Sequence, residues 1–126
     1  MMRSIYPLLA AAALMGGCDK GEETKSTATD PKVIAEAEQV WTNKCATCHG
    51  AEGRGDGTAG AALDPKPRNF HDRGWQMKVK DDHLKKVIVE GGAAVGLNAN
   101  MAPNPELADK PEVVAELVKR IRSYGK

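Results

Sequence analysis

The sequence predicts an all-α domain with three main helices and long connecting loops. Three segments carry apolar residues at helical spacing, and no segment shows the alternation of a half-buried strand. The chain is rich in loop-forming residues, with 13 glycines and 7 prolines. Aromatic residues make up only 4% of it, so side chains alone would give a small domain a thin core. Something other than side chains is therefore expected to fill the centre.

Residues 1–17 have the layout of a secretory signal peptide, with one arginine, an apolar run and then small residues. The apolar run from Ile5 to Met15 is shorter than the roughly 20 residues that span a bilayer. Export would place the chain in an oxidising compartment. Residues 18–30 begin with a cysteine and continue as a polar stretch, which is typical of a flexible tether. The folded domain is expected over 31–126.

The segment Leu14–Cys18 resembles a bacterial lipobox, in which the cysteine becomes the lipidated first residue of the mature protein. A lipobox usually has leucine three places before the cysteine, and Met15 occupies that place here. Lipidation would account for a cysteine that otherwise has no partner. The alternative is ordinary cleavage near the same point, which leaves a spare thiol on Cys18. In lipoproteins, an aspartate after the cysteine, here Asp19, is associated with retention at the inner membrane.

The first helix is predicted to begin after Asp30, because a capping side chain there precedes a proline in the first turn. Its apolar stripe continues to Trp41. The second helix is predicted over 81–90, where two aspartates begin it and a Gly-Gly pair ends it. The third is predicted from near Pro111 to Tyr124.

The remaining segments of the domain, 50–80 and 91–108, are predicted to be loops rich in glycine, proline and aspartate or asparagine. Loops of this length are uncommon inside a compact domain. They become reasonable if they wrap a large apolar ligand.

A C-x-x-C-H run at the end of the first helix, formed by Cys45, Cys48 and His49, indicates which ligand this is. In this motif the two thiols bond to the vinyl groups of haem, and the adjacent histidine ligates the iron. Two cysteines three residues apart on a helical turn face the same side, and the next residue brings an imidazole beneath the ring. One covalent haem c is therefore predicted.

Three other kinds of site can contain a C-x-x-C pair. A thiol–disulfide redox pair belongs with a βαβ pattern, which this sequence lacks. A zinc site needs a second pair of ligands, whereas His71 and His83 are single residues. A structural disulfide leaves the thin core and the long loops unexplained.

From Val33 to Tyr124 the sequence resembles the class I monohaem c-type cytochromes. The matching pieces are the helix before Cys45, C-x-x-C-H-G at 45–50, Pro-x-Pro-Arg-Asn-Phe at 65–70, Trp75, the Gly-Gly pair, Met-Ala-Pro at 101–103 and the C-terminal helix. The resemblance implies a small cytochrome c fold around one haem, with the first and last helices crossing near Trp41. Arg120 stands where the family commonly has a tyrosine, and Tyr124 is expected to substitute one turn later.

The second axial ligand must come from Met77, Met101, His71 or His83, once the methionines of the signal peptide are set aside. Met101 lies in a loop stiffened by two prolines, which would hold a weak thioether donor at little entropic cost. Met77 is as well explained as a packing residue, and the two histidines are expected at the surface. The resemblance places the distal methionine at Met101, which we therefore assign.

The surroundings of the haem are predicted more coarsely. In the family, a proline carbonyl after the motif accepts a hydrogen bond from the ligating histidine, so Pro65 and Pro67 are the candidates for His49. Arg68 and Trp75 are candidates for bonding the haem propionates, and the alternative for Arg68 is a solvent-facing charge. The glycine-rich stretch 53–60 is interpreted as turn backbone near the haem.

His49 and Met101 together would leave no open iron position, which favours outer-sphere electron transfer over enzyme chemistry. The predicted function is a single-electron carrier on the periplasmic side of the cell envelope, a monomer tethered through Cys18 that binds redox donors and acceptors transiently. The net charge of +1 argues against nucleic-acid binding. The alternatives are a haem enzyme or gas sensor with a labile Met101, and a fixed electron-entry subunit of a larger oxidoreductase.

Overall fold

A computed structural model describes residues 28–126, so the predicted signal peptide, Cys18 and most of the predicted tether lie outside the described residues. Within this range the chain is helical and contains no strand, which confirms the all-α prediction. The elements are α1 (Pro31–Val40), a π-helical turn (Trp41–Cys45), α2 (Ala46–His49), α3 (Arg73–Lys78), α4 (Asp81–Glu90), 3₁₀ turns at Ala93–Val95 and Pro105–Leu107, and α5 (Pro111–Ser123). No helix in this part of the chain is long and apolar enough to cross a membrane.

The first helix begins as predicted and continues further than its apolar stripe. The Asp30 carboxylate accepts a hydrogen bond of 2.8 Å from the amide of Lys32, which caps α1. The helix then passes through the π-helical turn into α2, and Gly50, with φ of +81°, ends it. The motif thus lies on the last two turns of one long helix, and π-helical turns are frequent at functional sites.

The prediction of loop over 50–80 is wrong at α3. The Asp72 carboxylate caps this helix by accepting a 3.0 Å hydrogen bond from the amide of Trp75. Six residues make fewer than two turns, and α3 has only Trp75 as a large half-buried apolar side chain, so no helical period is visible. The predicted loop over 91–108 also contains the two 3₁₀ turns.

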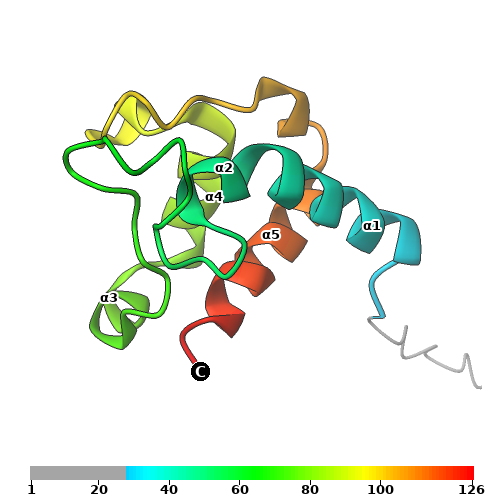
Figure 1. Ribbon diagram of the computed structural model, residues 1–126. Coiled ribbons are helices and arrows are strands. Elements are labelled where there is room, and N and C mark those ends of the chain that lie inside the picture. The colour runs from blue at the N-terminus through cyan, green and yellow to red at the C-terminus, as the bar shows by residue number, and fades with distance from the viewer. Residues whose placement is uncertain (1–27) are drawn as a thin grey trace, which may run out of the picture.

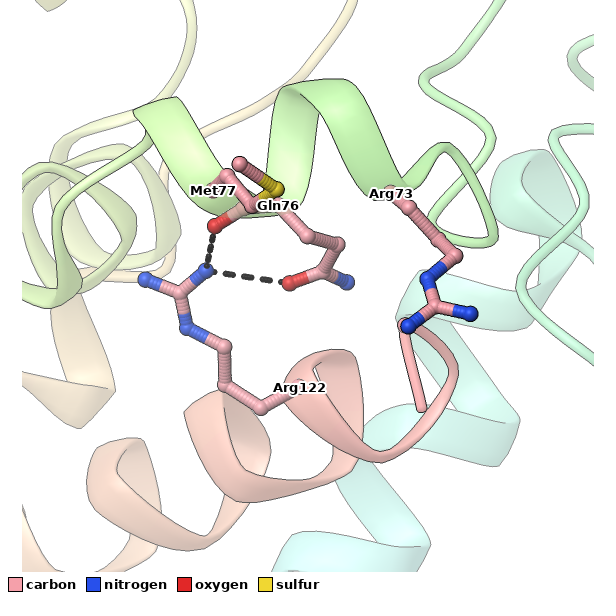
Figure 2. A pocket seen from close by; sticks show the side chains of 5 residues that line it. Arg73, Gln76, Met77 and Arg122 are labelled. Carbon is pink, nitrogen blue, oxygen red and sulfur yellow. Dashed lines mark hydrogen bonds between the residues drawn. The ribbon is translucent and has the colours of Figure 1, made fainter.

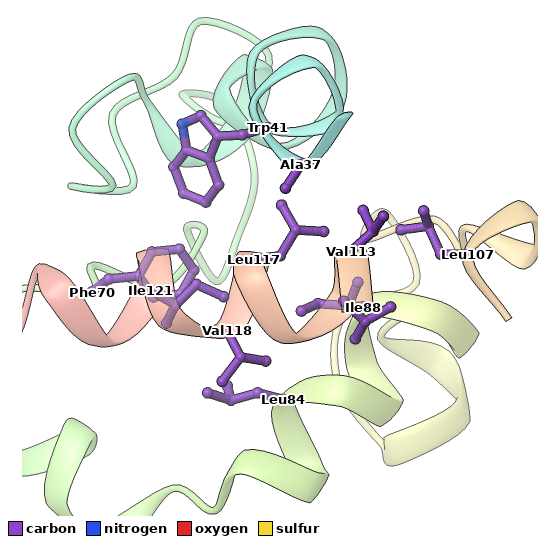
Figure 3. Close-up of a cluster of buried hydrophobic side chains, with 11 residues drawn as sticks. Ala37, Trp41, Phe70, Leu84, Ile88, Leu107, Val113, Leu117, Val118 and Ile121 are labelled. Carbon is purple, nitrogen blue, oxygen red and sulfur yellow. The ribbon is translucent and has the colours of Figure 1, made fainter. Parts of the chain in front are cut away.

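The hydrophobic core lies along α5, which α1 crosses (Figure 1). In Figure 3, Ala37 of α1 and Trp41 of the π-helical turn reach α5 from one side, and Leu84 of α4 reaches it from the other. The buried cluster consists of Ala37, Trp41, Phe70, Leu84, Ile88, Leu107, Val113, Val114, Leu117, Val118 and Ile121. Its α5 members form one helical stripe, so α5 is the element on which the others pack.

The crossing of α1 and α5 is built around Trp41, whose side chain is only 2% exposed. The Tyr124 ring lies 5.7 Å from the Trp41 ring, centroid to centroid, so the expectation that Tyr124 contributes there is confirmed. The guanidinium of Arg120 stacks over Trp41 at 4.9 Å, donates to the Tyr124 hydroxyl and pairs with Glu38. Arg120, which stands where the resemblance would place a tyrosine, therefore takes part in the helix crossing.

Candidate functional site

The two cysteines of the motif are half-buried, and neither forms a disulfide within residues 28–126. Cys45 ends the π-helical turn, and Cys48 lies in α2. Burial raises the pKa of the Cys45 thiol to about 11, although the positive charges of Arg120 and Lys44 act in the opposite direction. The Cys45 sulfur is therefore a protonated, neutral thiol near neutral pH and is free for addition to a vinyl group.

His49 has one ring nitrogen bonded, and the other has no hydrogen-bond partner in the part of the chain that the structure describes. Its Nδ1 lies 3.1 Å from the carbonyl oxygen of Arg68 and donates a hydrogen to it, which leaves the lone pair on Nε2. Burial lowers the pKa of His49, against the raising effect of the Arg68 carbonyl, so the ring is held neutral. A neutral imidazole whose second nitrogen is fixed by a carbonyl is the usual form of a metal-ligating histidine.

The expectation that a proline carbonyl orients His49 is wrong, because the acceptor is the carbonyl oxygen of Arg68. The carbonyl oxygen of Pro67 is instead turned toward Gly55, where a Cβ would clash with it. Because the Pro67 carbonyl is directed toward Gly55 by this close approach, the carbonyl of the next residue, Arg68, is the one that reaches the imidazole of His49.

Phe70 packs against one face of the His49 ring. The two rings stack with centroids 4.6 Å apart and planes 17° from parallel. Phe70 is 5% exposed and also contacts Trp75, with ring centroids 5.6 Å apart. No role for Phe70 is predicted from the sequence, although it lies in the run at 65–70 that carries the family resemblance.

The glycine-rich stretch is turn backbone that packs on the motif, as predicted. The amides of Gly55 and Gly57 donate to the carbonyl oxygens of His49 at 2.7 Å and Cys48 at 3.0 Å. These bonds satisfy carbonyls at the end of α2 that have no helical partner. A Cβ on Gly57 would clash with the Thr47 carbonyl oxygen and lie 2.6 Å from the carbonyl carbon of Cys48. The loop can therefore approach the motif this closely only if position 57 carries no side chain.

Met101 lies half-buried in a loop that is fastened to the end of α4. Its amide donates to the Asn98 carbonyl at 3.1 Å, and its own carbonyl accepts from the amide of Gly92 at 2.9 Å. Three residues later, the amide of Asn104 donates to the Val89 carbonyl at 2.9 Å. The loop that carries the thioether thus has a defined backbone, which suits a ligand of weak intrinsic affinity.

The other candidates for the second axial position lie in different surroundings. The side chain of Met77 is 87% exposed on α3, beside Arg73 and Arg122 (Figure 2). His83 is exposed in the first turn of α4, as expected. His71 is half-buried, and its Nε2 is 2.7 Å from the Glu52 carbonyl oxygen, so the expectation that it is exposed is wrong.

Arg68 and Trp75, the candidates for bonding the propionates, lie together. The Arg68 guanidinium is 5.4 Å from the centre of the Trp75 ring and 3.7 Å from the Asp72 carboxylate. The Arg68 side chain is 51% exposed. Arg68 is therefore a partly solvated charge with an aromatic and an acidic neighbour, and its use by a propionate stays a prediction.

The donor set fits a covalent haem. Two free thiols, a neutral imidazole with one free nitrogen and a thioether are soft or intermediate donors, which suit haem iron and its vinyl groups. Between residues 28 and 126, no group of three or more histidine, cysteine, aspartate or glutamate side chains is placed to hold a metal ion. The zinc site that was weighed from the sequence therefore has no ligand set in this part of the chain.

Comparison with known proteins is consistent with this donor set. Residues 34–122 match the protein family described as Cytochrome c. A curated relative is the Cbb3-type cytochrome c oxidase subunit CcoP of Rubrivivax gelatinosus, which is 30% identical over 104 residues. The match covers 82% of this chain and 30% of the relative, so the chain spans less than a third of the length of that protein.

Proposed function

The chain belongs to the cytochrome c family, which binds haem c covalently, and from this premise we propose that it is a single-electron carrier with His49 and Met101 as axial ligands. Cys45 and Cys48 would form the two thioether bonds. The observation that carries the proposal is the bond from His49 Nδ1 to the Arg68 carbonyl, which leaves Nε2 free to ligate.

The surrounding residues support transfer of an electron without bond breaking. Bound haem would supply an iron that can change between the ferric and ferrous states. His49 is held by Arg68 and Phe70, and the backbone of Met101 is held at the end of α4. Neither ligand would therefore have to move far when the oxidation state of the iron changes. Methionine ligation raises the reduction potential, because thioether sulfur favours ferrous iron. With both axial positions filled, the chain would act as a carrier and not as an enzyme.

Two single variants test the ligand assignment. Met101→Ala should remove the far-red absorption of the ferric protein that arises from sulfur bound to iron, and should open the site to added imidazole. Met77→Ala is the matched control, because its side chain is 87% exposed, and it should keep the wild-type spectrum. Loss of the far-red band in Met77→Ala alone would overturn the assignment of Met101.

We also propose that the protein is a lipid-anchored monomer on the periplasmic side of the cell envelope, through Cys18. A polar segment between the lipid and the domain would let the domain reach membrane-bound redox proteins. A single acyl chain anchors only marginally, so more than one chain on Cys18 is needed. In cells, Cys18→Ser should move the protein from the membrane fraction to the soluble fraction. Unchanged fractionation would exclude the anchor.

A fixed electron-entry subunit of a larger oxidoreductase is the second candidate. The relative from Rubrivivax gelatinosus is a subunit of an oxidase, and the chain matches only part of it. Affinity purification of the tagged full-length chain distinguishes the two roles. A free carrier should elute alone, whereas a fixed subunit should bring stoichiometric amounts of one larger redox enzyme.

A further inference from the structure

Gly92 is the second residue after α4, and its backbone conformation does not require glycine. Its φ of −64° and ψ of −39° are ordinary helical values, which alanine adopts readily. The neighbouring space is different, because a Cβ on Gly92 would clash with the Asn98 carbonyl oxygen and lie 3.3 Å from Met101 Cβ. The close approach of the loop 98–101 is therefore what excludes a side chain at this position.

The same residue is hydrogen-bonded to this loop through both of its backbone groups. The amide of Gly92 donates to the Met101 carbonyl at 2.9 Å, and its carbonyl accepts from the amide of Leu97 at 2.8 Å. α4 itself is anchored in the core through Leu84 and Ile88. The backbone of Met101 is thus fixed, through one glycine, to a rigid helix.

Asn104 fastens the other side of the loop. Its side-chain amide donates to the Ile88 carbonyl at 2.7 Å, and its backbone amide donates to the Val89 carbonyl at 2.9 Å. The loop is therefore attached at two places: Met101 itself is bonded to Gly92, and Asn104, three residues later, is bonded to the last turn of α4. Two attachments restrict the backbone of this segment more than either attachment alone.

We propose that the end of α4 positions the distal sulfur, with Gly92 as the closest contact and Asn104 as the second attachment. The inference rests on the proposed assignment of Met101 as axial ligand. A methionine side chain has three rotatable bonds, so the side chain alone does not fix the position of its sulfur. The position of the Met101 backbone would therefore decide what fraction of the molecules have the sulfur bound to the iron. A methyl group on Gly92 has to displace the carbonyl of Asn98. Because Asn98 and Met101 belong to the same short loop, this displacement also moves Met101 away from Gly92.

The test uses the matured haem protein and measures the affinity of the ferric form for imidazole, which competes with the sulfur. Gly92→Ala should keep its covalent haem, lose intensity in the far-red band and bind imidazole about 10- to 100-fold more tightly than wild type. Gly74→Ala is the matched control. It adds the same methyl group on α3, outside the loop, where the new Cβ would meet only the Asp72 carboxylate at 3.4 Å. Gly74→Ala should bind imidazole with wild-type affinity.

A second variant tests the positioning role if Gly92→Ala does not acquire its covalent haem. Asn104→Ala removes only the bond to the Ile88 carbonyl and should tighten imidazole binding in the same direction. Wild-type affinity in the variants that mature would overturn the positioning role. Met101→Ala separates this result from a failure of the proposed function. If Met101→Ala binds imidazole no better than wild type, Met101 is not the ligand, and the ligand assignment fails first.

Discussion

Phe70 joins the proposed haem ligand to the hydrophobic core. Its ring stacks on His49 at 4.6 Å on one side and lies 6.2 Å from Trp41 on another. The side chain is 5% exposed, so these contacts are made away from water. A single aromatic residue in a loop therefore supports both the orientation of the imidazole and the packing of the helix crossing.

Phe70→Ala should lower the free energy of unfolding by about 3–5 kcal/mol, because it removes a buried ring and leaves a cavity beside His49. The measurement is chemical denaturation of the haem-loaded protein. Met77→Ala is a control for the loss of a large apolar side chain at an exposed position, and it should change the same quantity by less than about 0.5 kcal/mol. Equal effects of the two substitutions would show that Phe70 does not support the site.

Gly57→Ala should destabilise the packing of the glycine-rich loop on the motif. The new methyl clashes with backbone atoms of Thr47 and Cys48, which cannot rotate away as a side chain could, so the loop must move away from α2. Overpacking of this kind costs about 1–3 kcal/mol. Thermal unfolding of the haem protein measures the loss. Gly74→Ala, whose methyl would meet only the Asp72 carboxylate at 3.4 Å, should have little effect, and a similar loss there would argue against the specific clash.

Among the elements, α3 is held in place by α5. Arg122 of α5 donates to the carbonyl oxygens of Gln76 and Val79, each at 2.7 Å, and to the Asp81 carboxylate (Figure 2 shows the bonds to Gln76). The Gln76 side chain in turn donates to the Ile121 carbonyl at 2.8 Å. A helix of six residues, too short to be stable on its own, is thus fixed by hydrogen bonds from a long one.

Arg122→Met should lower the free energy of unfolding by about 1–3 kcal/mol, because the carbonyls of Gln76 and Val79 lose a charged donor. Amide hydrogen exchange in α3 should accelerate more than exchange in α1. Arg73→Met is the control on the same surface, since the Arg73 side chain forms no hydrogen bond or ion pair with residues 28–126. Unchanged exchange in α3 would contradict the role of Arg122.

The sequence predicts well those elements whose ends are marked by local chemistry. The prediction of α4 over 81–90 is confirmed at both ends, because two aspartates favour its start and Gly91 ends it. The helix α3 is missed because its cap and its bonds to Arg122 have no counterpart in apolar spacing. The acceptor of His49 is likewise decided by the path of the chain around Gly55, which residue types alone do not determine.

The buried core belongs mainly to α1, the π-helical turn, α4 and α5. The long connections over 50–80 and 91–108 contribute only Phe70 and Leu107 to the buried apolar residues. Leu97 in the second connection is 53% exposed. These connections have little apolar packing of their own, so a covalently attached haem would provide much of the surface on which they order.

A chain without covalent haem, obtained with Cys45→Ser together with Cys48→Ser, should therefore lose much of its stability. Binding free energy contributes directly to folding when the site forms only in the folded state. We expect amide exchange over 50–80 and 91–108 to become the fastest within residues 28–126, and the crossing of α1 and α5 to persist longest. If the haem-free chain unfolds with the same midpoint as the haem protein, the fold does not depend on the cofactor.

We propose that side chains of this protein fill both axial positions of the haem iron. The most direct test is the optical spectrum of the reduced wild-type protein before and after addition of carbon monoxide, which binds ferrous haem only at an open or easily vacated position. We expect a low-spin spectrum that carbon monoxide leaves unchanged. A high-spin spectrum that shifts on addition of the gas would contradict it and would point to a haem enzyme or a gas sensor.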